Sequence, residues 1–446
     1  MSSWGGSMVR ADTRTGGREA AGGVIEGGGA LAVGKPATAT ARGFSWVKLT
    51  DVARLESGHT PSRRQDSYWN GGIPWVGIRD ATGNHGRVIT ETAQNISQAG
   101  LENSSARLLP AGTVCLSRTA SVGYVVVMGT SMATSQDFVN WVCGPGISSS
   151  YLRYVLVAEQ QTVRRFSQGS THQTVYYPEV KAFHVCLPGR GEQQAIADVL
   201  GALDDKIALN ESICATELDL GDALHQVTVE QGSATQRGTL GQLMAEGSLH
   251  FGDGYRTKKA EHGTPGLPIL RVAEVGDGMI SPSFGDHVRE EFRSAMGQKT
   301  SRSGDVVLTT KGTVGRVAII SAHDAEFVYS PQVCFFRPLG DAPISSAYLF
   351  HWLRGQEFWY QAAGMKGQTD MADYLSLSDI RSLKISLPEE SALSAFDRQC
   401  APLHARAEAA RRENRTLADL RDTLLPQLIT GKLRVKDATR VVEEAV

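Results

Sequence analysis

Residues 196–224 read IADVLGALDDKIALNESICATELDLGDAL, and residues 396–424 read FDRQCAPLHARAEAARRENRTLADLRDTL. Both stretches carry a seam at alternating steps of four and three residues, the spacing of helices that pair in a coiled coil. The second seam repeats the first at a constant offset of 200 residues. Two helices of about 35 residues would each span about 50 Å. The intervening chain has room to return, so the pattern predicts an antiparallel pair. The apolar core of this pair is predicted at Ile196, Leu200, Leu203, Ile207, Leu224, Phe396, Leu403, Leu417 and Leu424.

The centre of each seam is more polar than its first half. Asn210 and Asn414 either fix the register of the two helices or mark a loosened seam that faces solvent or a partner. Pro402 removes a backbone donor inside the second helix. We therefore expect this helix to bend at Pro402 or to begin late.

The repeat extends into the segments that precede the helices. Three pairs of matching stretches occur in the same order: AGTVCLSRTASVG (111–123) and SGDVVLTTKGTVG (303–315), YLRYVL (151–156) and YLFHWL (348–353), VCLP (185–188) and ISLP (385–388). This predicts an α+β protein with two similar mixed α/β lobes, separated by the two long antiparallel helices in a pseudo-two-fold, circular repeat. Duplex DNA, which has its own approximate dyad, is the leading candidate target.

Domain boundaries follow from the repeat and from local composition. Residues 1–43 are rich in glycine and alanine and poor in large apolar residues, so we expect them to be disordered. Within them, GALAVGKP (29–36) approaches a phosphate-binding loop but has Pro36 where a serine or threonine would hold magnesium. The predicted division is a disordered extension at 1–43, a first recognition lobe at 44–188, a central helix at 189–230, a second lobe at 231–388, a C-terminal helix at 389–432 and a tail at 433–446.

Bulk composition is that of an ordinary globular protein. The chain has 446 residues, 41% hydrophobic and 21% charged, with a net charge of −2. Composition alone slightly favours a protein that does not bind nucleic acid, and any such surface must be a local basic patch. The six cysteines form no CxxC pair or zinc-type spacing, so we expect reduced core thiols, a cytoplasmic location and no metal site. The isolated histidines, predicted to be core or surface residues, are His172, His250, His262 and His351.

No catalytic constellation is evident, and we predict no catalytic or cofactor-binding residues. Methyltransferase and helicase motifs are missing from the sequence. Glu179-Val-Lys181 has the shape of a nuclease metal site, but its repeat counterpart is Asp379-Ile-Arg381, which favours a structural ion pair.

A binding signal recurs at equivalent places in the two lobes. The segment GSTHQT (169–174) corresponds to GQTDM (367–371), with basic residues just before each. Short polar side chains with Arg or Lys can contact phosphates and base edges, although a single tract of this kind is usually only a turn. The predicted DNA-binding residues are Arg63, Arg64, Arg118, Thr119, Arg164, Arg165, His172, Gln173, Arg256, Lys258, Thr310, Lys311, Lys366, Gln368 and Thr369.

Two segments carry a family resemblance. LPGRGEQQAIADVLGALDDKI (187–207) resembles the central conserved region of type I restriction–modification specificity subunits, and LADLRDTLLPQLITGKLRV (417–435) resembles their C-terminal conserved region. The resemblance extends over about residues 44–435. It implies two target recognition domains that each read half of a split DNA site. It also implies that the helices dock two methyltransferase subunits, which methylate adenine with S-adenosylmethionine, and that ATP-dependent restriction subunits can join in phage defence.

Two departures from the family pattern weaken one implied docking face relative to the other. The first helix ends in ELDLGDAL (217–224), without the Leu-Leu-Pro step, and the second begins with EESAL (389–393). Two other classes remain as alternatives. A single-chain restriction enzyme would need catalytic motifs, and a duplicated scaffold that does not bind DNA would lack a basic face on either lobe.

Overall fold

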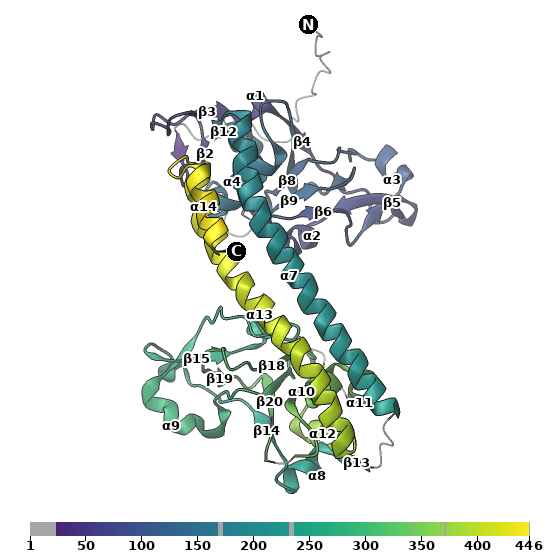
Figure 1. Ribbon diagram of the computed structural model, residues 1–446. Helices are drawn as coiled ribbons and strands as arrows, with labels where there is room; N and C mark the ends of the chain where they lie inside the picture. Colours follow the sequence, from purple (N-terminus) through teal and green to yellow (C-terminus); the bar gives the residue numbers. More distant parts are fainter. Residues whose placement is uncertain are drawn as a thin grey trace. The chain divides into compact units, whose positions relative to one another are not determined.

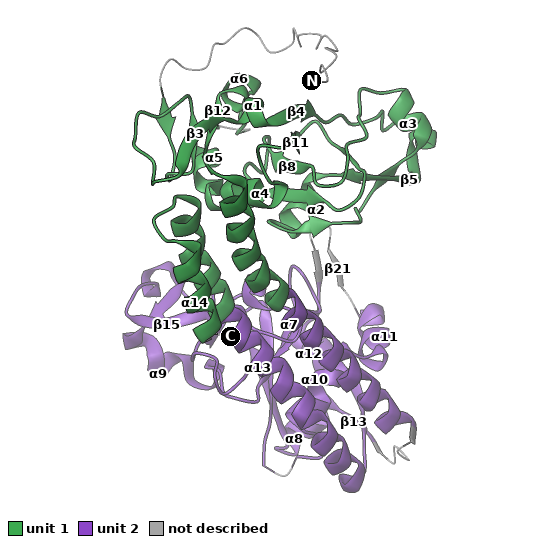
Figure 2. Cartoon of the chain, turned by 45° about the horizontal axis from the view of Figure 1, so that its top comes forward, with its two compact units in different colours: residues 1–207, 416–446 green, residues 208–415 purple. Residues whose placement is uncertain are grey.

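The structure is a computed structural model that describes residues 24–167, 173–231, 236–340, 342–365, 367–369 and 372–445. The chain divides into two compact units (Figure 2). The first comprises residues 1–207 and 416–446, and the second comprises residues 208–415. Each long helix therefore contributes to both units, which corrects the prediction of helical domains separate from the lobes. The cause is packing, because the apolar face of each helix is buried against lobe residues as well as against the other helix.

The main sheet of the first unit has five strands. Their order is β4 (Ala53–Ser57), β11 (Phe138–Cys143), β8 (Val114–Ser117), β9 (Val125–Met128) and β6 (Val88–Ile89). Helix α4 (Ser149–Ala158) packs on β8 and β9. A smaller sheet has the order β10 (Ala133–Thr134), β5 (Trp69–Val76) and β7 (Asn95–Ile96).

The second unit repeats this plan with four strands in its main sheet. Their order is β14 (Leu249–Asp253), β20 (Val333–Pro338), β17 (Val306–Thr309) and β18 (Val317–Ile319). Helix α10 (Ser346–Arg354) packs on β17 and β18. The small sheet has the order β16 (His287–Arg289), β15 (Gly266–Leu270) and β19 (Val328–Tyr329). The predicted α+β duplication, with strands and helix in the same order, is confirmed.

Shorter elements complete each unit. In the first unit they are β3 (Phe44–Lys48), α1 (Leu49–Val52), α2 (Ile78–Gly83), α3 (Gln98–Glu102), α5 (Gln160–Arg165), α6 (Tyr177–Lys181) and β12 (Phe183–Pro188). In the second they are β13 (Gln236–Thr239), α8 (Leu240–Ala245), α9 (Arg293–Met296), α11 (Gln356–Met365), β21 (Gly367–Thr369), β22 (Ala372–Tyr374), α12 (Leu377–Ser382) and β23 (Lys384–Leu387).

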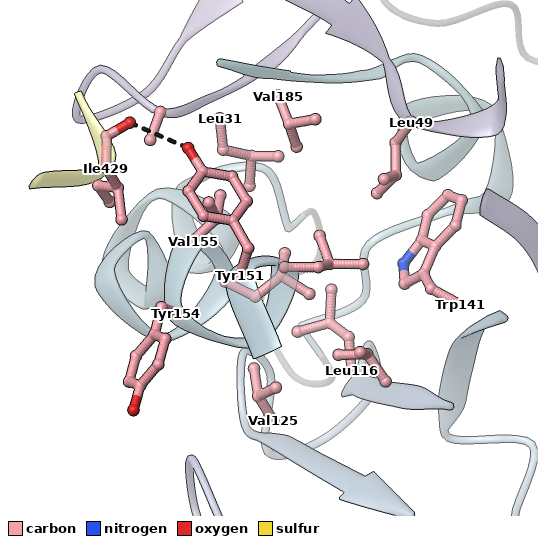
Figure 3. Packing of buried hydrophobic residues seen from close by; sticks show 14 of the residues in the cluster. Leu31, Leu49, Leu116, Val125, Trp141, Tyr151, Tyr154, Val155, Val185 and Ile429 are labelled. Atoms are coloured by element: carbon pink, nitrogen blue, oxygen red, sulfur yellow. Dashed lines mark hydrogen bonds between the residues drawn. The ribbon is translucent and has the colours of Figure 1, made fainter. Parts of the chain in front are cut away.

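The two units share an equivalent hydrogen bond from a buried tyrosine hydroxyl. The Tyr151 hydroxyl donates to the Cys186 carbonyl over 2.8 Å, and the Tyr348 hydroxyl donates to the Ser386 carbonyl over the same distance. In the first unit, Tyr151 also lies 3.3 Å from the carbonyl oxygen of Ile429 (Figure 3). Each of these tyrosines therefore ties its lobe to the strand that leads into a long helix.

Helices α7 (Arg190–Gln231) and α13 (Glu390–Ile429) run side by side (Figure 1). In the second unit, Cys214 contacts the Ala407 carbonyl and Glu217 pairs with Arg406, so positions rise along α7 as they fall along α13. The helices are antiparallel, as predicted. All predicted seam positions are buried or half-buried. The helix α13 continues through Pro402, so the expected late start is wrong.

The N-terminal prediction of disorder is wrong for residues 24–43, while residues 1–23 lie outside the described part of the chain. Strand β2 (Leu31–Val33) is buried and pairs with both β1 (Ile25–Glu26) and β12. The backbone N–H groups of Gly28 and Ala30 each donate to the buried carboxylate of Glu159 over 2.7 Å. The composition of residues 24–43 could not predict this contact, because Glu159 is about 130 residues away in the sequence. Its carboxylate accepts hydrogen bonds from the glycine-rich backbone.

The predicted tail at 433–446 forms a helix instead. Helix α14 (Val435–Ala445) is strongly amphipathic and buries Ala438 in the core of the first unit. Its turn from α13 uses Gly431 at a positive φ of 69°.

Candidate nucleic-acid interface

A tight loop follows an inner strand of each main sheet, β8 in the first unit and β17 in the second. In the first unit, the Ser117 hydroxyl at the end of β8 accepts from the Tyr124 N–H over 2.8 Å and donates to the Ser121 carbonyl over 2.5 Å. The Gly123 N–H then donates to the Ser117 carbonyl over 2.9 Å. These bonds hold residues 118–122 as a compact loop, with Arg118 and Thr119 at its start.

The second unit builds its loop in the same way. The Thr309 hydroxyl accepts from the Arg316 N–H over 2.9 Å and donates to the Thr313 carbonyl over 2.6 Å. The Gly315 N–H donates to the Thr309 carbonyl over 2.9 Å. The loop at residues 310–314 is therefore the structural counterpart of residues 118–122, as the sequence repeat predicts.

Glycine closes both loops for a geometrical reason. Gly123 and Gly315 have φ values of 89° and 100°, a region that residues with a side chain rarely adopt. A Cβ atom on Gly123 would lie 3.0 Å from the Gln160 side chain, and one on Gly315 would lie 2.1 Å from Trp359. The loop of the first unit thus lies directly against α5, and the loop of the second unit lies directly against α11.

The backbone at the end of the first polar segment, and the backbone just after the second, is hydrogen-bonded to these loops. In the first unit, the Val175 N–H donates to the Arg118 carbonyl over 2.9 Å, and the Ala120 N–H donates to the Gln173 carbonyl over 3.2 Å. In the second, the Leu375 N–H donates to the Thr310 carbonyl over 3.0 Å. The backbone at or just after each polar segment is therefore hydrogen-bonded to the loop of its lobe.

In the first unit, a further loop at residues 58–64 lies near the loop at 118–122. Arg63 and Arg64 on it were predicted from the sequence, but the residues that link the two loops were not. In the first unit, the Thr60 hydroxyl is hydrogen-bonded to the exposed Gln136 side chain. The carbonyl of Asp137, the next residue, accepts from the Arg118 N–H over 2.7 Å. Residues 58–64 are thereby linked to the loop at 118–122. The second unit contains the same kind of bond, because the Thr310 N–H donates to the Gln332 carbonyl over 2.9 Å.

Two of the predicted basic residues lie on the loop at 58–64. The Arg63 guanidinium stacks over the Trp69 ring at 3.8 Å and donates to the Gln94 side chain over 2.9 Å, while its side chain remains exposed. Stacking on an aromatic face restricts the rotamers of an arginine and leaves its outer edge free to meet an anion. Arg64 is exposed beside it.

The basic residues around the 118–122 loop differ in their availability. Arg165 is exposed. Arg164 is half-buried and donates from Nε to the Val122 carbonyl over 3.2 Å, so it supports the loop. Arg118 is half-buried with its guanidinium 4.9 Å from the Tyr177 ring centre. Gln173 and Thr119 lie beside it, the first exposed and the second half-buried.

In the second unit, Lys258, Arg256 and Lys311 are exposed, and Arg256 has only a long 3.8 Å ion pair with Asp253. Thr310 is a correction to the predicted set, because its side chain is buried and its hydroxyl donates to the Gln332 carbonyl. Burial in the loop scaffold removes this hydroxyl from the surface. His172 and Lys366 lie outside the described residues, as do the side chains of Gln368 and Thr369, whose backbone forms β21.

A histidine beneath the first loop is kept neutral. The Nδ1 atom of His85 accepts from the Val125 N–H over 3.1 Å, and its ring meets Tyr124 edge-on. Burial, followed by the positive charges of Arg164 and Arg421, lowers the pKa of His85 below its ordinary value. The neutral ring is the form that this hydrogen bond requires.

No helix in the described ranges is both long and apolar enough to cross a bilayer. Comparisons with known proteins agree with the geometry. Residues 42–216 match the family model described as "Type I restriction modification DNA specificity domain". The chain is 25% identical over 418 residues to the type I restriction enzyme MjaIX specificity subunit of Methanocaldococcus jannaschii, covering 87% of this chain and 93% of that protein.

Two further similarities are more limited. The HindI specificity subunit of Haemophilus influenzae is 31% identical over 97 residues, which is 22% of this chain and 20% of that protein. The crystal structure of the type I restriction–modification S subunit from M. genitalium shares the fold, with a TM-score of 0.50, 15% identity, and coverage of 88% of this chain and 98% of that chain. The duplicated lobes, the antiparallel helices and the nearly full-length similarity to the MjaIX specificity subunit make this chain similar to type I restriction–modification specificity subunits, and residues 42–216 match their DNA specificity domain.

Proposed function

We propose that each lobe of this DNA-specificity subunit reads one half of an asymmetric, bipartite DNA site. The observation that carries the proposal is the duplicated loop scaffold, in which Ser117 and Thr309 make the same three hydrogen bonds in the two units. Because both units hold their loops in the same way, the two loops are expected to serve as DNA-recognition surfaces of the same kind. The residues on the scaffold differ, with Arg118 and Thr119 in one loop and Lys311 in the other, so the half-sites should differ in sequence.

Charge supports the assignment of these loops to DNA. The whole chain has a net charge of −2, so attraction to phosphates must be local. Exposed basic residues occur on the loops of both units, at Arg63, Arg64, Arg256, Lys258 and Lys311, and at the end of α5, at Arg165. In the proposed division of labour, exposed basic side chains contact phosphates and set orientation, whereas Gln173 and its neighbours meet base edges.

The long helices supply the other half of the proposed function. Their outer faces, opposite the buried seam, would dock two methyltransferase subunits that carry S-adenosylmethionine and methylate adenine. ATP-dependent restriction subunits would join the same assembly. The chain itself would act as a non-catalytic specificity subunit, because its described polar residues support loops and helices rather than a reaction centre.

Binding titrations against DNA with one half-site scrambled at a time test the two-lobe division. The partner methyltransferase is included, so that the complete recognition complex is measured. An arginine or glutamine change in the first unit should relax the requirement for one half-site only. A change in the second unit should relax only the other half. Equal effects on both halves from either unit would rule out the division.

A further inference from the structure

Three potential metal ligands meet in the interior of the second unit. Cys400 and His404 are one turn apart on α13, and His351 comes from α10. The Nε2 atoms of the two histidines are 2.9 Å apart, and the Cys400 Sγ lies 3.3 Å from His351 Nε2 and 3.4 Å from His404 Nε2. The three ligand atoms lie within 4.8 Å of one another. From the sequence, His351 was predicted to be an isolated core or surface histidine and the cysteines to be core thiols, and His404 was not considered, although the i, i+4 spacing of Cys400 and His404 was a signal.

The distances nearly match a tetrahedral zinc site. With standard zinc–nitrogen and zinc–sulfur bonds, two ligand nitrogens are about 3.3 Å apart and a nitrogen and a sulfur are about 3.6 Å apart. The observed separations are shorter by a few tenths of an ångström. Small rotations of the two imidazoles would therefore open the required space without any movement of the helices.

A carboxylate sets the orientation of one candidate ligand. Asp222 on α7 lies with Oδ1 2.6 Å from His351 Nδ1, and the Arg354 guanidinium fixes Asp222 with Nη2 2.9 Å from Oδ2. Asp222 therefore selects the tautomer in which Nδ1–H donates to the carboxylate. The lone pair on Nε2 of His351 then points at Cys400 and His404. An outer carboxylate that orients a ligating histidine is a common feature of zinc sites.

The first unit shows what the same scaffold contains without these ligands. The positions equivalent to His351, Cys400 and His404 are Tyr154, Leu200 and Asp204. There a hydrogen bond of 2.7 Å from the Tyr154 hydroxyl to Asp204 closes the contact. In the first unit, α4 and α7 therefore pack together without a histidine or cysteine at these positions. All three positions carry metal-ligating residue types in the second unit alone.

We propose that His351, Cys400 and His404 bind one zinc-type divalent transition-metal ion, with Asp222 as the positioning residue. The Cys400 thiol would lose its proton to solvent as the sulfur binds the metal, and the two imidazoles would bind through their Nε2 lone pairs. A water molecule would complete four-fold coordination. A cavity of about 300 Å³, lined in part by His404 and Phe350, lies next to the cluster and can admit it. The ion would fasten α10 to α13 in the second unit.

Metal content and cobalt spectroscopy of the untagged full-length chain test this proposal, because a polyhistidine tag would itself bind metal. The expected result is about one zinc per chain after purification. After zinc is removed, titration with Co²⁺ should give visible d–d bands and a near-ultraviolet sulfur-to-cobalt band that saturate at one equivalent. Wild-type protein with neither bound zinc nor a saturable sulfur-to-cobalt band would overturn the proposal, whatever the variants do.

Variants identify the ligands. Cys400→Ser should abolish the sulfur-to-cobalt band, and His404→Gln should remove stoichiometric binding. Asp222→Asn should keep the sulfur band but weaken metal affinity by about 10–100-fold, as expected for an outer carboxylate. Cys214→Ser is the matched control, because Cys214 is a cysteine on the α7 seam that hydrogen-bonds to the Ala407 carbonyl rather than to the cluster. A sulfur band that survives Cys400→Ser but disappears in Cys214→Ser would refute the assigned site.

Discussion

The side-chain amide of Asn210 on α7 donates to the side-chain oxygen of Asn414 on α13 over 2.9 Å. The same amide also donates to Glu413 over 2.7 Å, and Asn210 is only 2% exposed. Of the two interpretations open to the sequence, the structure therefore supports register fixation over a seam loosened toward solvent. A buried amide has its partner in one register alone, so these bonds specify how α7 and α13 align.

The first prediction concerns this pair. Asn210→Leu removes the donor of both bonds and should lower the free energy of unfolding by about 1–3 kcal/mol. The double variant Asn210→Leu, Asn414→Leu should recover much of this loss, because an apolar pair suits the seam. Urea unfolding of both proteins measures the coupling. Ser212→Leu on the exposed face of α7 is the control and should change stability by less than about 0.5 kcal/mol. Additive losses in the double variant would contradict a direct Asn–Asn interaction.

A second prediction follows from the glycine that closes the loop of the second unit. Gly315→Ala places a Cβ 2.1 Å from Trp359 and forces alanine to a φ of 100°. The loop at 310–314 should shift, with a cost of at least about 1 kcal/mol and weaker discrimination at one half-site only. Gly285→Ala, whose Cβ meets no atom within 4 Å, is the control. Binding assays with each half-site scrambled in turn report the effect, and unchanged discrimination would mean that this loop does not read DNA.

The third prediction separates base readout from phosphate contact in the first unit. Gln173→Ala should cost about 1–3 kcal/mol on the cognate site and less on non-specific DNA. Arg63→Ala should weaken binding to all sequences alike and reduce the slope of log affinity against log salt by about one unit. Titrations at several salt concentrations measure both. If Arg63→Ala changed sequence preference without changing the salt slope, its assigned role as a phosphate contact would be wrong.

The fourth prediction uses the helices as a ruler. Inserting one heptad into α7 and one at the matching point of α13 adds about 10 Å of helix, or roughly three base pairs of rise. In the proposed function, methylome sequencing should then show unchanged half-sites with a longer spacer. An insertion in α7 alone should destroy activity, because it moves Asn210 out of register with Asn414. Changed half-sites with the original spacer would refute the ruler.

The fifth prediction concerns acid. Protonation of His85 would break its bond from the Val125 N–H, and the pKa of His85 in the folded chain lies below its unfolded value. The unfolded state therefore takes up the proton first, so the His85 contribution to stability is present above about pH 6.5 and is lost as the pH falls below that value. His85→Gln, which can still accept from Val125, should flatten the pH dependence of the unfolding midpoint. A variant with the same acid sensitivity as wild type would exclude His85 as a source.

The sequence by itself determined the repeat, the antiparallel helices and the matched loops, because these depend on periodicity and on local turn chemistry. A seam at steps of four and three residues in the sequence marks a helix that buries one face. Ser117 and Thr309 occupy equivalent positions in the repeat, so the sequence also places equivalent loops after them. The tertiary structure alone decided what depends on distant partners. Glu159 orders the glycine-rich segment at 28–31, Thr310 is buried by its bond to Gln332, and His351 meets Cys400 and His404 from another helix. Each of these contacts joins residues more than 20 positions apart, and local composition carries no information about such a pair until the chain folds and packing brings it together.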